Sequence, residues 1–108
     1  MTPLLECGPV ALKAGSHNLV VQGDVDFDTA AALAGAGSAW LREQPAGSLV
    51  ILDLTGIEHV SSAALSVLLE WLRQARSVNV VIQNVELSTP LARLTAVAGL
   101  DALLPAGD

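Results

Sequence analysis

The hydrophobic and polar positions of the chain change their spacing several times, and each change marks an expected element. Apolar residues recur at helical spacing in three segments, which follow positions 26, 62 and 89. Continuous apolar runs lie between them, at residues 48–54 (S-L-V-I-L-D-L) and 78–83 (V-N-V-V-I-Q). Runs of this kind are typical of strands buried on both faces of a parallel sheet.

The N-terminal segment predicts two further strands. Residues 4–10 form a weak first strand, and the Gly8-Pro9 pair within it indicates an edge position. After a turn at residues 15–18, residues 18–22 (N-L-V-V-Q) predict a second strand that pairs back on the first.

Each helical segment begins with a capping signal. Asp26 or Asp28 is the expected N-cap of the first helix, Ser62 of the second and Thr89 of the third, where Pro90 follows at the first helical position. We expect the glycines of the first helix, Gly35 and Gly37, to admit close packing against the sheet. The inward faces are expected to carry Ala30, Leu33, Gly37, Trp40 and Leu41 in the first helix, and Leu65, Leu68, Leu69 and Leu72 in the second.

These elements predict an α/β domain with the order β-β-α-β-α-β-α, to which residues 102–105 would add a short final strand. Alternation of strands and helices implies a mixed sheet, of four to five strands with three to four helices. Nothing divides the chain, so residues 1–108 are predicted to form one domain.

Composition narrows the class of function. The formal net charge is -6 and the five basic residues form no run, which argues against nucleic-acid binding and against adsorption to an anionic membrane surface. Direct membrane insertion is not expected either, because no apolar run is long enough to span a bilayer. Cys7 is the only cysteine, so an internal disulfide and a cysteine-based zinc site are excluded. No secretion signal or membrane-spanning run is evident, and a cytoplasmic location is therefore expected.

The acidic pattern of Asp24, Asp26 and Asp28 resembles the start of a calcium loop. That loop needs Gly at its sixth position and Glu at its twelfth, and the chain has Thr29 and Gly35 there. We therefore interpret the pattern as helix-capping chemistry.

No enzyme is predicted. Ser62, His59 and Asp53 could approach one another at the end of a strand, but no strained turn separates the serine from the histidine as a triad requires. The two histidines lie far apart and have no partner at metal-ligand spacing. No metal or cofactor is expected.

The turn at residues 59–67 (H-V-S-S-A-A-L-S-V) carries two interpretations. In the first interpretation Ser62 is a helix cap, which typically contributes about 1 kcal/mol. The same place offers unpaired N–H groups and the positive end of a helix dipole, which favour a phosphate on that serine. One residue could serve both purposes.

At this turn the chain resembles the STAS domains, named for sulfate transporters and anti-sigma-factor antagonists. The similarity is carried by residues 21–33 (V-Q-G-D-V-D-F-D-T-A-A-A-L), by residues 49–69 around D-L-T-G-I-E-H-V-S-S-A-A-L, and by residues 79–85. Ser62 falls on the phosphorylatable Ser/Thr of the family and Leu65 on its leucine. Two positions depart from the pattern, because Ser61 replaces an aspartate and Ala64 replaces a glycine.

The resemblance implies a non-enzymatic adaptor. The chain is most similar to small members that bind and activate the ATPase subunit of a phospholipid-trafficking ABC transporter, which places them peripheral to the inner membrane. The partner-binding surface implied by the family comprises His59, Ser61, Ser62, Ala63 and Ser66. The alternative is an anti-sigma-factor antagonist regulated by phosphorylation of Ser62, and the loss of the aspartate at Ser61 favours the adaptor.

The sequence leads to different predictions for the two tryptophans. Trp40 falls on the apolar face of its helix and is predicted to lie in the core. Trp71 lies one position off the leucine stripe, which leaves two roles open: core packing at the edge of the sheet, or an exposed interface anchor.

Overall fold

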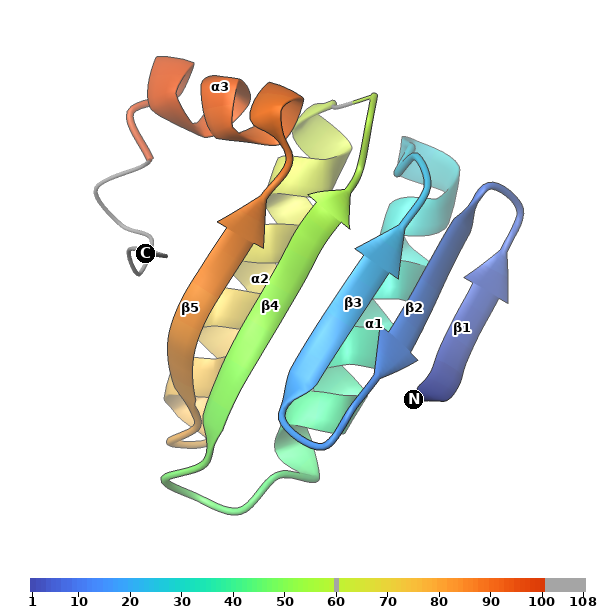
Figure 1. Ribbon diagram of the computed structural model, residues 1–108. Coiled ribbons are helices and arrows are strands. Elements are labelled where there is room, and N and C mark those ends of the chain that lie inside the picture. The colour runs from blue at the N-terminus through green and yellow to red at the C-terminus, as the bar shows by residue number, and fades with distance from the viewer. Residues whose placement is uncertain (60, 101–108) are drawn as a thin grey trace.

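The computed structural model describes residues 1–59 and 61–100 and confirms an α/β fold, with a five-stranded mixed sheet and three helices (Figure 1). The predicted final strand at residues 102–105 lies outside this range. The elements, in chain order, are β1 (Thr2–Cys7), β2 (Val10–Ala14), β3 (Asn18–Gln22), α1 (Phe27–Arg42), β4 (Leu49–Gly56), α2 (Ser62–Ser77), β5 (Val81–Leu87) and α3 (Thr89–Val97).

The observed order begins with three strands, so the prediction of a single first strand at residues 4–10 was wrong. Gly8, with φ of 58°, and Pro9 instead form the turn of a hairpin that joins β1 to β2. Glycine readily adopts the positive φ that such a turn requires. The second predicted strand, β3, consequently pairs antiparallel with β2 rather than with β1.

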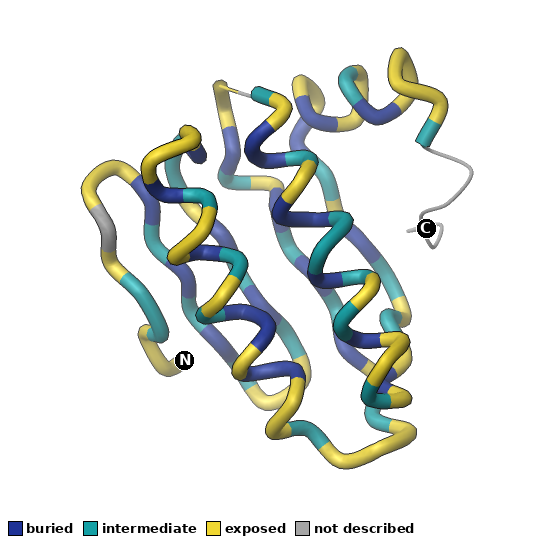
Figure 2. The backbone as a smooth tube through the Cα atoms, turned by 180° about the vertical axis from the view of Figure 1, so that it is seen from behind, coloured by how far each residue is buried: buried dark blue, intermediate teal, exposed yellow. Residues whose placement is uncertain are grey.

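The five strands lie in sequence order across the sheet, antiparallel from β1 to β3 and parallel from β3 to β5. Helices α1 and α2 cover one face of the sheet, whereas α3 lies at the end where β3, β4 and β5 finish (Figures 1 and 2). Strand β4 is therefore not buried on both faces as predicted. Its residues alternate between buried and more exposed positions, and Val50, Leu52 and Leu54 point to the core.

The remaining predicted boundaries shift by a few residues. Helix α2 continues to Ser77 and Asn79 adopts a φ of 60°, so β5 starts at Val81 rather than at residue 78. The N-cap of α3 is Ser88, whose hydroxyl accepts a hydrogen bond from the Leu91 N–H at 3.3 Å, and not Thr89.

Trp71 joins the two large helices. The side chain is fully buried, and its indole N–H donates to the Ala34 carbonyl of α1 at 3.2 Å. A Cβ atom at Gly37 would lie only 2.3 Å from the indole. Gly37 therefore allows close packing against Trp71, whereas close packing against the sheet was predicted. Trp71 is thus a core residue, which decides the question left open by its position, and Trp40 is buried as predicted.

Candidate functional site

The candidate site lies where the chain leaves β3 and β4 at the same end of the sheet. Because these strands are parallel, their following loops meet there. The Gly23 N–H donates to the Gly56 carbonyl at 3.2 Å. Asp24 holds His59 twice, through the backbone N–H at 3.1 Å and the ring Nδ1 at 3.2 Å. These bonds tie together two loops that are about 35 positions apart in sequence and so fix the position of the exposed His59.

Ser61, and not Ser62, is the N-cap of α2, so the predicted cap was wrong by one residue. The backbone of Ser61 is extended (φ -141°, ψ 170°), and its hydroxyl accepts from the Ala63 N–H at 3.2 Å. The same hydroxyl donates to the Val25 carbonyl at 3.1 Å, which adds another bond between the loops. Both adjacent residues are serines, and capping preferences cannot choose between them. The contact with Val25 distinguishes them.

Ser62 is consequently free of the capping role. It is the first residue of α2 and its side chain is exposed. Ser66 lies four positions later, on the same outward face, and its hydroxyl donates to the Ser62 carbonyl at 2.9 Å. Ala63 is 1% exposed and faces the core, so its methyl group is not part of the outer surface. Of the five predicted partner-binding residues, His59, Ser62 and Ser66 are exposed and Ser61 is partly buried beneath them.

The acids of the D-x-D-x-D pattern have separate structural tasks. Asp26, one of the two predicted caps, is the N-cap of α1: its carboxylate accepts from the Thr29 N–H at 2.9 Å and from the Thr29 hydroxyl at 3.0 Å. These bonds, led by the backbone N–H, lower the pKa of Asp26 below its ordinary value. Asp24 holds His59. Among residues 1–59 and 61–100, no group of three or more acidic, histidine or cysteine side chains could hold a metal ion.

Ser62, His59 and Asp53 do not form a catalytic arrangement. The His59 ring pairs with Asp24, while Asp53 accepts hydrogen bonds from Thr55 at 3.0 Å and 2.6 Å. The histidine is therefore paired with Asp24, whereas the triad would require it to pair with Asp53.

Phe27 is a surface feature that the sequence prediction missed. It is 73% exposed at the start of α1, two residues after the Val25 carbonyl that accepts from Ser61. The signal in the sequence is that Phe27 precedes the apolar face predicted for the first helix, which begins at Ala30. The flanking acids are not a signal of exposure, because Val25 also lies between two aspartates and is buried.

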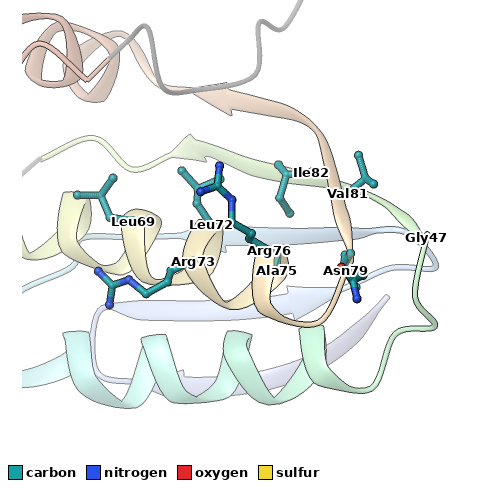
Figure 3. Close-up of a pocket in the computed structure, with 10 residues that line it drawn as sticks. Gly47, Leu69, Leu72, Arg73, Ala75, Arg76, Asn79, Val81 and Ile82 are labelled. Carbon is teal, nitrogen blue, oxygen red and sulfur yellow. The ribbon is translucent and has the colours of Figure 1, made fainter.

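A groove lies toward the opposite end of α2, between this helix and the edge strand β5 (Figure 3). Its volume is about 840 Å³. Leu69 and Leu72, predicted to face the core, are only half-buried and line this groove, whereas Leu68 is fully buried. The face of α2 that packs inward is instead formed by Ala63, Ala64, Val67, Leu68, Trp71 and Ala75.

The fold and the turn define the class of protein. A model of the family described as "Mlab, STAS domain" matches residues 10–105, most of the chain. The chain therefore belongs to the STAS domains. Within them it belongs to the MlaB-like family that this model describes. A search of curated proteins found no match. Within the described part of the chain, no helix is both long and apolar enough to cross a bilayer.

Proposed function

We propose that this protein is a non-enzymatic adaptor that binds the ATPase subunit of an ABC transporter for phospholipid trafficking and outer-membrane lipid asymmetry. It would stabilise and activate that subunit. The observation that carries the proposal is the exposed Ser62 at the start of α2, at the functional turn of an MlaB-like STAS domain. In this proposal the protein is cytoplasmic and reaches the inner membrane only through its partner.

The geometry of the turn supports a docking role. Ser62 and Ser66 carry small uncharged side chains, which permit close approach of a partner surface. The loops beneath them are held by hydrogen bonds from His59 and Ser61. A surface that is already ordered loses little conformational freedom when it binds.

The unpaired N–H groups at the start of α2 supply a second element of recognition. Helix N-termini carry partial positive charge and favour an acceptor or an anionic group on the partner. Ser61 satisfies only the Ala63 N–H of that turn through its side chain. The partner surface would therefore present acceptors opposite Ser62.

The test is co-purification with the ATPase subunit. Ser62→Arg places a long cation on the docking surface, against the positive end of the helix, and should reduce recovery of the complex at least tenfold. Ser77→Arg is the matched control, because it makes the same change at the opposite end of α2, where a cation is favourable. Circular dichroism and thermal melting establish that both variants fold. Undiminished recovery of a folded Ser62→Arg variant contradicts the proposal.

The alternative, an anti-sigma-factor antagonist switched by phosphorylation of Ser62, needs the same exposed hydroxyl. In the structure Ser61, at the position of the family's aspartate, is occupied as the helix cap. An aspartate could cap the helix equally well, so the argument rests on the loss of its charge, which favours a permanent docking surface over a switch. The adaptor remains the preferred function.

A further inference from the structure

Phe27 contributes little to the fold and is available to bind. Of the three aromatic residues in the chain, the two tryptophans are buried and Phe27 is 73% exposed. The capping box of Asp26 and Thr29 fixes the first turn of α1, so the exposed ring stands on an ordered support. Asp28 follows it and is also exposed. Together Phe27 and Asp28 form an apolar knob with an acidic flank.

The groove between α2 and β5 has the complementary character. Its apolar wall includes Leu69, Leu72 and Ile82. None of the described residues that line it is acidic, although acids outnumber bases 11 to 5 in the chain. In Figure 3 the Arg76 side chain extends alongside Leu72 on the side of Ile82, whereas Arg73 extends the other way. Arg73 is paired with Glu70 at 2.7 Å.

Two cations line the groove, and Arg76 is the one without an ion-pair partner among the described side chains. The ion pairs between described side chains join Asp24 to His59 and Glu70 to Arg73, and Arg76 takes part in neither. An apolar groove with an available guanidinium group favours an apolar side chain that is accompanied by a carboxylate.

We propose that the groove binds the Phe27 knob of a second copy of this chain, with the ring against Leu72 and Ile82 and the Asp28 carboxylate facing Arg76. Both halves of the contact are present on one molecule. The knob starts α1 at the end where β3 finishes, whereas the groove includes Gly47 and Asn79, which precede β4 and β5. The two halves therefore lie toward opposite ends of the molecule, and one copy does not satisfy its own contact.

Such a contact is head to tail. The two copies use different surfaces, so each added copy leaves one knob and one groove free and the association continues into short chains. A single aromatic side chain and one ion pair form a small interface, which is typical of weak and transient encounters. We expect a dissociation constant on the order of 0.1–1 mM.

The test is sedimentation equilibrium of the full chain between about 10 µM and about 1 mM, a range that brackets the expected dissociation constant. The average mass of the wild-type protein should rise with concentration above the mass of one chain. Phe27→Ala, which lacks the knob, and Arg76→Glu, which repels it, should each remain monomeric. Arg42→Glu is the matched control, since it changes a cation in the last turn of the other large helix, outside the groove, and should associate like the wild type.

Mixing the two monomeric variants gives the decisive result. Phe27→Ala keeps its groove and Arg76→Glu keeps its knob, so an equimolar mixture should form dimers and nothing larger. A wild-type protein that stays monomeric at 1 mM, or a mixture that forms no dimer, overturns the proposal. Ser62→Arg should associate like the wild type, which separates this result from any failure of the adaptor function.

Discussion

The two ends of α2 present opposite chemistry on one helix. Its N-terminal end carries exposed serines beside acidic loops, and hydrogen bonds between those loops fix the surface. Its C-terminal end carries Arg73 and Arg76 beside half-buried leucines, and there the surface is an apolar groove. Acids near helix N-termini and cations near C-termini both complement the helix dipole. The comparison shows how one amphipathic helix can separate a polar surface from an apolar groove.

The largest expected effect comes from separating α2 from α1, since that contact supports both ends. In Gly37→Ala the new methyl group would meet the Trp71 indole, and the tryptophan must move. Gly35→Ala is the matched control, because nothing lies within 4 Å of a Cβ atom there and the gain in helix propensity is the same. We expect the free energy of unfolding of Gly37→Ala to fall below that of Gly35→Ala by about 1–3 kcal/mol.

Urea denaturation of both variants measures this difference. Equal stability of the two alanine variants would show that Trp71 does not depend on the missing side chain of Gly37. Loss of stability in Gly37→Ala alone would confirm that the close contact between the helices is the constraint.

A second prediction sharpens the description of the N-terminal end. Ser61→Ala removes the cap of α2 and the bond to the Val25 carbonyl, and should lower the free energy of unfolding by about 1–2 kcal/mol. Ser62→Ala removes an exposed hydroxyl that caps nothing, and its effect should lie within about 0.5 kcal/mol of zero. Chemical denaturation of the two variants gives the comparison. A larger loss in Ser62→Ala would reverse the assignment of the cap.

Local pattern predicted the elements better than the contacts between them. The helices and the parallel strands follow from spacing. Asp26 was one of the two predicted caps of the first helix, because capping depends on neighbouring residues. The first hairpin was missed because Gly8 and Pro9 were taken as irregularities within one strand rather than as a turn. This miss is an error about local chemistry.

The other misses concern contacts between distant residues. Trp71 is buried because Gly37 of another helix leaves room for it, and nothing in the spacing of α2 records that glycine. Ser61 is the cap in a pair of serines because the Val25 carbonyl, 36 positions earlier, engages its hydroxyl. The candidate turn could thus be found from the sequence, whereas the roles of its two serines depend on tertiary contacts.

The smallest expected effect concerns the acidic cap of α1. Hydrogen bonds from Thr29 hold the pKa of Asp26 below its ordinary value of 3.8, so the ionised form is favoured in the folded state. Its contribution to stability is fully present above the unfolded pKa and is lost as the pH falls through the lower, folded pKa. Asp26→Asn keeps a capping oxygen but removes the charge. The wild type should therefore be slightly more stable than Asp26→Asn at pH 7, and the difference should close below about pH 3.8.

Urea denaturation of both proteins at pH 7 and pH 3 measures that difference directly. The other carboxyl groups titrate in both proteins, so their contributions cancel to a first approximation. A difference that stays constant between the two pH values would mean that the charge of Asp26 does not contribute. The capping hydrogen bonds alone would then stabilise the N-terminus of α1. Of Asp26 and the cations at the C-terminal end of α2, which complement the helix dipoles, only the cations would then be expected to contribute.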